Sequence, residues 1–258
     1  MKNLSIEAEP FEALRYLNAG RRGPTVERLP IHRGRADGLP DGVDAVLCAS
    51  DLQGMAPGPD GAALLGVGLA ARYPELADRA LVPRPERTGV FLAGDLWADP
   101  LSRSRGGFGP VDDVWAAFAS RFAWVTGVAG NHDDVSLVPE LDDAYLLDGE
   151  VVRLPGLIVG GVGGIIGEKK KPGRRSEGAF FSALDDVLVE SPDVVVLHEG
   201  PEGDRRQRGH PAIGARLRTM QVRLTICGHV HWAEPLATLG PTGQVLNVDG
   251  RAVVLERR

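Results

Sequence analysis

The stretch DAVLCASDLQG, residues 44–54, joins a short apolar run to an aspartate, a glutamine and a glycine. A continuous apolar run of this length is typical of a strand buried on both faces of a sheet. Similar apolar runs, bounded by Gly, Asp, Pro or His, recur at residues 88–94, 123–130, 157–164, 193–198 and 223–229. We therefore expect six buried strands.

Helices are expected between these strands, at residues 61–72, 111–122, 180–189 and, from a weaker pattern, 211–219. The alternation of strand and helix predicts an α/β fold with helices packed over the sheet. Three short β-like runs after Trp232 predict an antiparallel finish and hence a mixed sheet. The first 43 residues are read as an extension with one helix-like piece over 11–17 and a loop over 21–40. Because no linker separates two cores, residues 1–258 are predicted to form a single domain.

Composition narrows the possible partners and compartments. The formal net charge of −6 gives nucleic acid or an anionic membrane no global attraction, so either would need a local basic patch. The two cysteines lie in separate apolar runs without C-x-x-C spacing. The N-terminal residues lack the apolar core of a signal peptide, and the longest apolar run, 157–167, is too short to cross a bilayer. We expect a reduced cytoplasmic protein with no membrane partner; its oligomeric state is left open.

Side chains able to bind metal ions follow the ends of the predicted strands. They are Asp51, Asp95, Asn131, His198 and His229. Ligands of open α/β sheets bind beyond the carboxyl ends of the strands, so we expect these side chains to converge. A pair of divalent ions ~3.5–4 Å apart needs a bridging carboxylate and further oxygen and nitrogen ligands. The pattern predicts a metal site at the C-terminal strand edges.

The residues around these positions form five short motifs in a fixed order. They read D-x-Q-G at 51–54, G-D at 94–95, G-N-H-D at 130–133, a single histidine at 198 and G-H-x-H at 228–231. Each motif alone is weak, but the ordered set is a strong signal. The chain resembles the calcineurin-like metallophosphoesterase superfamily, whose motifs run D-x-H, G-D, G-N-H-[DE], H and G-H-x-H.

The resemblance implies a fold and a cofactor. The fold is a four-layer αββα sandwich, in which two mixed β-sheets lie face to face with helices outside. The cofactor is a pair of divalent metal ions bridged by Asp95. The first metal would be bound by Asp51, Gln53 and His231, and the second by Asn131, His198 and His229.

The resemblance also implies a catalytic role for His132. This histidine would stabilise charge on the phosphate or protonate the leaving oxygen. Its supporting acid could be Asp99, Asp133 or Asp134, and the sequence does not choose among them.

Gln53 departs from the family pattern, which has histidine at this position. An amide oxygen is a weaker donor than an imidazole nitrogen but is equally neutral. The first site becomes richer in oxygen, which suits Mn²⁺ or Mg²⁺ better than Zn²⁺ or iron. We therefore expect an active, Mn²⁺-dependent enzyme whose first metal is weakly held, with iron, zinc and magnesium as the other candidates.

Two basic loops allow two interpretations of the substrate. One carries Lys169, Lys170, Lys171, Arg174 and Arg175, and the other carries Arg205, Arg206 and Arg208. These side chains either belong to solvated loops or grip phosphate groups above the metal centre. The second interpretation favours a polyanionic substrate such as a nucleotide or a nucleic-acid strand.

We predict a hydrolase that cleaves phosphate esters by a two-metal mechanism and prefers diesters. A phosphomonoesterase is one alternative, because the motifs are common to the whole family. Another is a non-catalytic scaffold that binds a protein partner, although the retention of His132 argues against it. A hydrolase of lipid-linked phosphates is a third, but no long apolar loop supports it.

Overall fold

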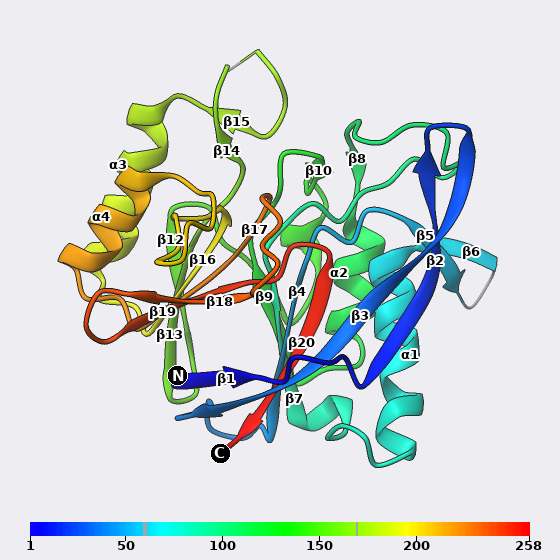
Figure 1. Ribbon diagram of the computed structural model, residues 1–258, viewed down its shortest axis with the longest axis horizontal. Helices are drawn as coiled ribbons and strands as arrows, with labels where there is room; N and C mark the ends of the chain where they lie inside the picture. Colours follow the sequence, from blue (N-terminus) through cyan, green and yellow to red (C-terminus); the bar gives the residue numbers. More distant parts are fainter. Residues whose placement is uncertain (59–60, 169) are drawn as a thin grey trace.

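The computed structural model describes residues 1–58, 61–168 and 170–258, whose strands form two large mixed sheets (Figure 1). The larger sheet runs in the order β11 (Ala144–Leu146), β9 (Trp124–Gly127), β7 (Thr88–Leu92), β4 (Ala45–Ser50), β20 (Arg251–Arg257), β3 (Gly23–Asp37), β2 (Glu12–Gly20), β5 (Met55–Gly58) and β6 (Gly61–Leu64), with β1 (Lys2–Ile6) paired to β3. The smaller runs in the order β12 (Glu150–Leu154), β13 (Leu157–Val162), β16 (Val194–Glu199), β17 (Leu224–Gly228), β19 (Gly243–Asn247) and β18 (Leu236–Leu239). All six strands expected from apolar runs are present.

Within the described residues, four α-helices lie on the outer faces of the two sheets. They are α1 (Leu65–Asp78), α2 (Asp112–Ala119), α3 (Glu177–Val189) and α4 (Pro211–Thr219). Each overlaps a helix expected from the sequence. The first begins later than expected, because residues 61–64 pair with β5 as strand β6. No helix in the described ranges is long and apolar enough to cross a membrane.

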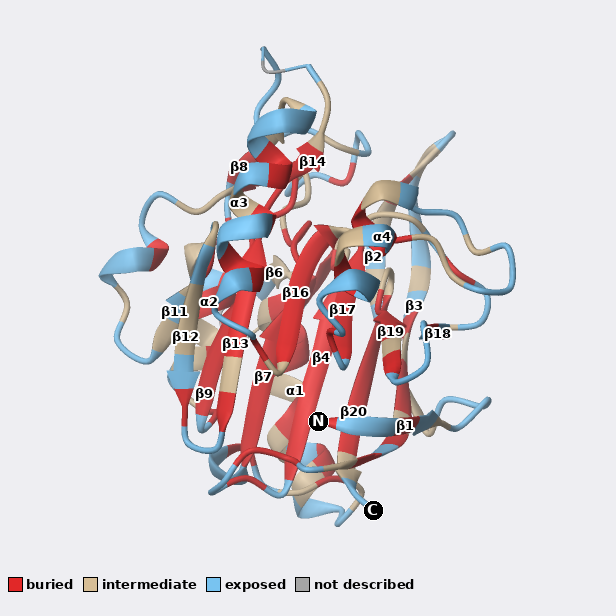
Figure 2. Ribbon diagram, turned by 90° about the vertical axis from the view of Figure 1, so that its left-hand side faces the viewer, coloured by how far each residue is buried: buried red, intermediate tan, exposed pale blue. Residues whose placement is uncertain are grey.

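Alternating side chains on the strands build three separate cores. The central strands of the sheets are buried along most of their length (Figure 2). On β16, Val194 and Val196 point into the core between the two sheets. Val195 and Leu197 point the other way, into the core beneath α3 and α4. Strand β4 alternates in the same manner between the inter-sheet core and a third core beneath α1 and α2. Three cores between four layers confirm the predicted αββα sandwich.

The N-terminal prediction was wrong. Residues 11–17 fall mostly in β2 and residues 21–40 mostly in β3, which form a long antiparallel hairpin. Leu14 and Tyr16 pack against the core beneath α1, whereas Leu17 is 44% exposed. This two-residue alternation suits a strand. The hairpin joins the larger sheet through β20, so the first 43 residues belong to the sandwich.

The C-terminal prediction was right only in part. Strands β18 and β19 are antiparallel, as expected. Strand β20 instead crosses to the larger sheet, where it pairs antiparallel with β4 and parallel with β3. The crossing completes the buried centre of that sheet, which accounts for the apolar run at 252–255.

The two cysteines have a packing role in the hydrophobic cores. Cys48 is in the inter-sheet core and Cys227 in the core beneath α3 and α4, and both are free and buried. Burial raises the pKa of Cys227 to about 12 and that of Cys48 higher still. Both thiols therefore stay protonated at neutral pH.

Candidate metal centre

The candidate site lies where strands of both sheets end, and three of its residues have a left-handed backbone. Asp51, Asp95 and His229 have φ angles of 54°, 54° and 66°. Such a conformation costs a non-glycine residue about 1–3 kcal/mol and is held by the surrounding structure. Here the amide of Asp51 donates to the carbonyl of Gly94 at 2.9 Å, which ties the ends of β4 and β7 together.

Two glycines of the sequence motifs permit close packing at this edge. A Cβ atom on Gly130 would lie 2.0 Å from Asp95 Oδ1, and one on Gly228 would lie 2.4 Å from Asp51 Oδ2. Both distances are far below van der Waals contact. The motif glycines therefore let the backbone approach the two carboxylates.

Asp95 lies at the centre of the site and is 3% exposed. Its Oδ1 accepts a hydrogen bond from the amide of His132 at 3.0 Å and lies 3.3 Å from His198 Nε2. Its Oδ2 accepts one from Gln53 Nε2 at 3.3 Å. One carboxylate thus joins three residues from other strands: Gln53 after β4, His132 after β9 and His198 on β16.

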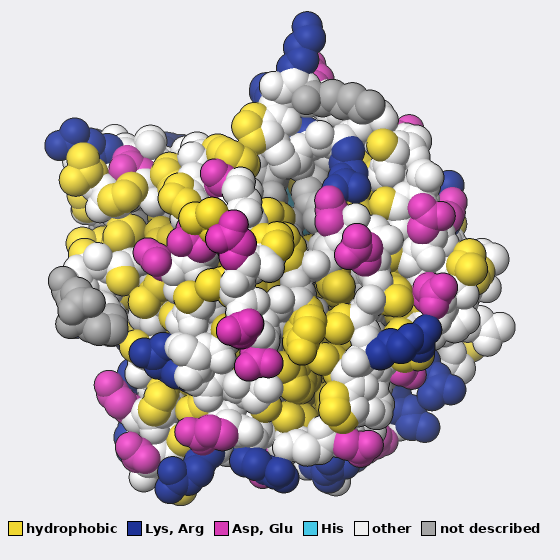
Figure 3. All heavy atoms as spheres, turned by 180° about the vertical axis from the view of Figure 1, so that it is seen from behind, with side chains coloured by type: hydrophobic (Ala, Val, Ile, Leu, Met, Phe, Trp, Pro, Cys, Tyr) yellow, Lys and Arg dark blue, Asp and Glu magenta, His cyan; other side chains and the backbone are white. Residues whose placement is uncertain are grey.

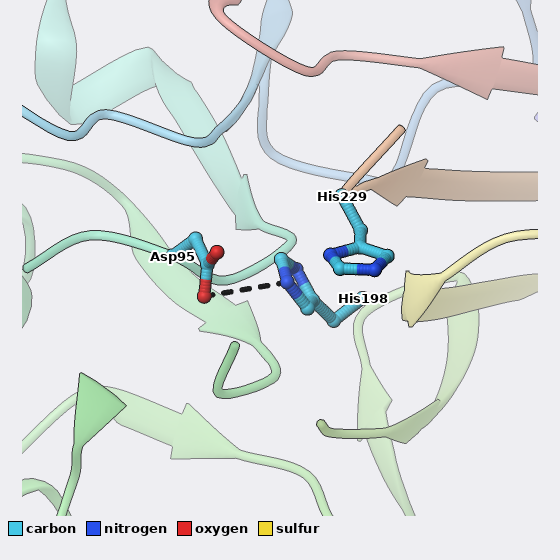
Figure 4. Close-up of side chains that lie close together, drawn as sticks. All are labelled: Asp95, His198 and His229. Atoms are coloured by element: carbon cyan, nitrogen blue, oxygen red, sulfur yellow. Dashed lines mark ion pairs between the residues drawn. The ribbon is translucent and has the colours of Figure 1, made fainter. Parts of the chain in front are cut away.

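Asp95, His198 and His229 form a close cluster (Figure 4). Each offers one ligand atom, and these atoms all lie within 4.8 Å of one another. The Nδ1 atom of His198 lies 2.7 Å from the carbonyl of Ala93. An Nδ1–H that donates to this carbonyl leaves Nε2 as the ligand atom.

Two buried polar atoms of the predicted ligands have no hydrogen-bond partner among the described residues. They are Oδ1 of Asn131 and Nε2 of His198, the second of which faces Asp95 Oδ1 at 3.3 Å as an ion pair outside hydrogen-bond geometry. A buried polar atom without a partner is costly, which makes such atoms rare in folded proteins. A divalent cation would use a lone pair from each, together with Asp95 and His229. The residues present therefore fit a metal ion.

The other predicted metal ligands are arranged differently. Asp51 Oδ2 accepts hydrogen bonds from Ser50 Oγ at 2.6 Å and from the amide of His229 at 2.9 Å. The side chain of His231 is 64% exposed, and neither it nor Asp51 belongs to the close cluster of described residues. Gln53 presents its amide nitrogen to Asp95, so a half-turn of the amide is needed to present its oxygen. The structure thus assembles one set of ligands more closely than the other.

The sequence profile described as calcineurin-like phosphoesterase matches residues 45–233, well over half of the chain. The chain belongs to this family. It is a metallophosphoesterase, a hydrolase of a metal-dependent family that acts on phosphate esters. A search among curated proteins gave no significant match.

Solved structures resemble this phosphoesterase in fold. The protein TT1561 of Thermus thermophilus is 16% identical, with a TM-score of 0.55 over 80% of this chain and 88% of its own. A putative 5′-nucleotidase from Staphylococcus aureus is 18% identical, with a TM-score of 0.49 over 79% of this chain and 48% of its own. The sulfate thiohydrolase SoxB of Thermus thermophilus is 14% identical, with a TM-score of 0.42 over 82% of this chain and 52% of its own. The phosphoesterase thus spans about half the length of the last two proteins.

The two histidines of the cluster differ in protonation. Burial lowers the pKa of His198, but the adjacent Asp95 carboxylate outweighs burial and raises that pKa to about 10. Burial and the neighbouring His198 lower the pKa of His229 to about 4. Without metal, His229 therefore presents a free lone pair at neutral pH, whereas His198 must release a proton before it binds a cation.

None of the three acids considered for His132 contacts its ring. The Nδ1 atom of His132 instead bonds the carbonyl of Gly107. Asp99 accepts from backbone amides of residues 101, 103 and 104, and Asp134 accepts from Ser136. Because the partner is a backbone carbonyl in a distant loop, no side-chain motif could have predicted it.

Sequence reasoning missed two residues beside His231. Asp249 Oδ1 lies 3.0 Å from Nδ1 of His231, and Arg251 Nη2 lies 3.3 Å from its Nε2. Asp249 follows β19, so the strand-end rule applied to residues 243–250 could have found it. Arg251 carried no local signal, because its position depends on β20 crossing between the sheets.

Asp133 holds the site loops together rather than supporting His132. Its carboxylate accepts from the amides of Leu96 at 2.7 Å, Trp97 at 3.1 Å and Gly130 at 2.8 Å. We expect Asp133→Ala to lower the free energy of unfolding by about 3 kcal/mol, because it leaves three amides without their acceptor. Urea unfolding of metal-free protein measures this loss. Asp134→Ala is the control, and an equal loss in both variants would contradict the assignment.

Proposed function

We propose that this metallophosphoesterase hydrolyses phosphodiesters with two divalent metal ions, preferably Mn²⁺. The observations that carry the proposal are the cluster of Asp95, His198 and His229 and the buried Oδ1 of Asn131, which has no hydrogen-bond partner among the described residues. Asp95 would bridge the ions. Asn131, His198 and His229 would complete the tighter site, and Asp51, Gln53 and His231 the weaker one.

The bound ions would neutralise charge on the phosphate and lower the pKa of attacking water. His132 is suited to act on the leaving oxygen. Its ring is anchored through Nδ1 to the carbonyl of Gly107, while its side chain is 26% exposed and its Nε2 lies 3.8 Å from Asp95 Oδ2. An anchored, solvent-accessible imidazole beside the cluster can hold a proton for the departing alkoxide.

Two cations of the basic loops are paired with acidic side chains. Arg175 is paired with Asp148, and Arg205 with Glu234. Lys170 and Lys171 are exposed on the loop between β14 (Ile165–Ile166) and β15 (Arg174–Arg175), whose basic tip projects from the molecule in Figure 3. Lys169 lies outside the described residues. These two ion pairs reduce the charge that the loops offer to a polyanion such as a nucleic-acid strand.

The test is hydrolysis of bis(p-nitrophenyl) phosphate and p-nitrophenyl phosphate by metal-stripped protein titrated with Mn²⁺. We expect turnover of the diester that depends on Mn²⁺ and exceeds turnover of the monoester. Faster hydrolysis of the monoester would favour a phosphomonoesterase. Metal binding without turnover of either ester would favour the scaffold function.

Gln53→His should strengthen the weaker metal site. An imidazole nitrogen replaces an amide oxygen, so we expect the Mn²⁺ concentration for half-maximal activity to fall about 10-fold. This is the lower end of the change in metal affinity that follows when a residue supporting a metal ligand is altered. Mn²⁺ titration of diester hydrolysis measures this change, and Gln53→Ala is the matched variant in which half-activation should move the other way. Unchanged half-activation in both variants would show that residue 53 is not a metal ligand.

A further inference from the structure

A cavity of about 640 Å³ opens beside His231, the proposed ligand of the weaker metal site. Its walls include Ile6, His32, Arg205, Leu236 and Arg251. We infer that this cavity binds the organic group esterified to the scissile phosphate, and that the group is of nucleoside type. The inference rests on the proposed function, because it names the class of diester.

The lining combines apolar walls with hydrogen-bonding groups. Ile6, Pro30 and Leu236 supply apolar surface. His32 is 9% exposed, and its Nδ1 lies 3.2 Å from the carbonyl of Glu7, which leaves Nε2 as an acceptor. Apolar walls with a few placed polar groups are typical of sites for flat, polar-edged molecules.

Arg251 links the cavity to the metal centre. This arginine is 5% exposed, donates through Nη2 to the carbonyl of Trp232 and lies 3.3 Å from Nε2 of His231. A buried guanidinium beside a predicted metal ligand is placed to contact the phosphate or the first oxygen of the esterified group. A ligand whose phosphate lies at His231 would therefore pass Arg251 to reach the cavity.

The size and charge of the cavity argue against a polymer. Two arginines, Arg205 and Arg251, are balanced by two glutamates, Glu7 and Glu234, within the lining. The cavity thus has no excess positive charge for a second phosphate. Its volume lies in the range of pockets that enclose one small molecule. A neutral base and sugar suit it better than a nucleic-acid strand or a lipid chain.

Much of the cavity comes from segments outside the family match at 45–233. Strand β1 lies beside β3 and β18 on one face of the molecule (Figure 1). Residues 6–8 follow from β1, Pro30 and His32 from β3, and Leu236 and Arg251 from the C-terminal strands. The segment after β1 and strand β3, together with the C-terminal strands, would thus supply specificity to a site whose chemistry is common to the family.

The test compares Ala8→Trp, which narrows the cavity from its exposed rim, with Ala123→Trp at an exposed alanine elsewhere. Calorimetry of Mn²⁺-loaded protein measures binding of thymidine 5′-monophosphate and inorganic phosphate. We expect wild type and Ala123→Trp to bind the nucleotide more tightly than phosphate. Ala8→Trp should bind the nucleotide at least ~10-fold more weakly and should bind phosphate as the wild type does. A ten-fold weaker affinity corresponds to the loss of roughly 1.4 kcal/mol of binding free energy.

Equal nucleotide binding by Ala8→Trp and wild type would overturn the inference, as would a wild type that binds nucleotide no more tightly than phosphate. Turnover of methyl p-nitrophenyl phosphate, whose methyl group leaves the cavity empty, reports separately on the proposed function. Turnover of this ester with nucleotide binding insensitive to Ala8→Trp overturns the cavity assignment alone. Sensitive binding without turnover supports the cavity and contradicts the proposed function.

Discussion

Asp95→Asn is expected to lower metal-dependent diester hydrolysis by roughly 10³–10⁴-fold. The bound metals stabilise the transition state by several kcal/mol, and each loss of about 1.4 kcal/mol slows the reaction ten-fold. The asparagine keeps the size of the side chain but removes the charge that Gln53, the amide of His132 and His198 all face. Both proposed metals share this carboxylate, so metal content should fall together with activity. Steady-state kinetics and elemental analysis of the purified variant measure the two effects.

Asp99→Asn is the matched control for Asp95→Asn. Asp99 accepts hydrogen bonds only within the turn that follows it, at residues 101–104, among the described residues. We expect this variant to retain its metal and most of its activity. Asp95 would not bridge the centre if Asp95→Asn bound a full complement of metal and kept more than about a tenth of wild-type activity. Such a variant would have lost less than about 1.4 kcal/mol of transition-state stabilisation.

His132→Ala is expected to lower diester hydrolysis by about 10²–10³-fold, the usual contribution of a general acid. Metal content should stay at the wild-type value, because the ring of His132 is not part of the cluster of Asp95, His198 and His229. The loss should also depend on the leaving group. A diester with a nitrophenolate leaving group needs little protonation, so it should be affected less than one with an alkoxide leaving group. Turnover of the two diesters, measured side by side, tests this difference.

His210→Ala provides a histidine control for His132→Ala. His210 lies at the start of α4, where its ring packs against Phe181, and it is not part of the cluster of Asp95, His198 and His229. We expect its activity to remain within about 2-fold of wild type, since a residue outside the chemistry changes the barrier by under 1 kcal/mol. An equal loss in the two variants, or loss of metal from His132→Ala, would assign His132 a structural role.

Strands buried on both faces were the most predictable part of the fold. Runs such as residues 44–50 and 193–198 are apolar throughout, because one side of each strand faces the inter-sheet core and the other faces a helix layer. Such a run marks a strand without knowledge of its neighbours. The hairpin of β2 and β3 was missed, because polarity does not follow burial along it: the apolar Leu17 and Val26 are exposed, whereas the polar Asn18 is half-buried.

The candidate site was predictable only where its residues carry local motifs. Asp51, Asp95, Asn131 and the histidines each stand at a strand end within a short pattern, so their types and positions can be read without coordinates. Asp249 and Arg251 lie in segments where such a reading indicated only β structure. Their proximity to His231 follows from the order of strands in two sheets.

The sequence by itself determined the buried strands, the layered α/β class and the candidate residues at the strand ends, because local polarity and residue type encode them. Only the tertiary structure decided which of those residues converge, which atoms stay unpaired and what lies beside them. Three features depend on contacts between segments far apart in the chain. They are the amide of Gln53 that faces Asp95, the carbonyl that anchors His132, and the cavity lined by N-terminal and C-terminal segments. Such contacts depend on strand order and on the path of β20, and no local pattern specifies either.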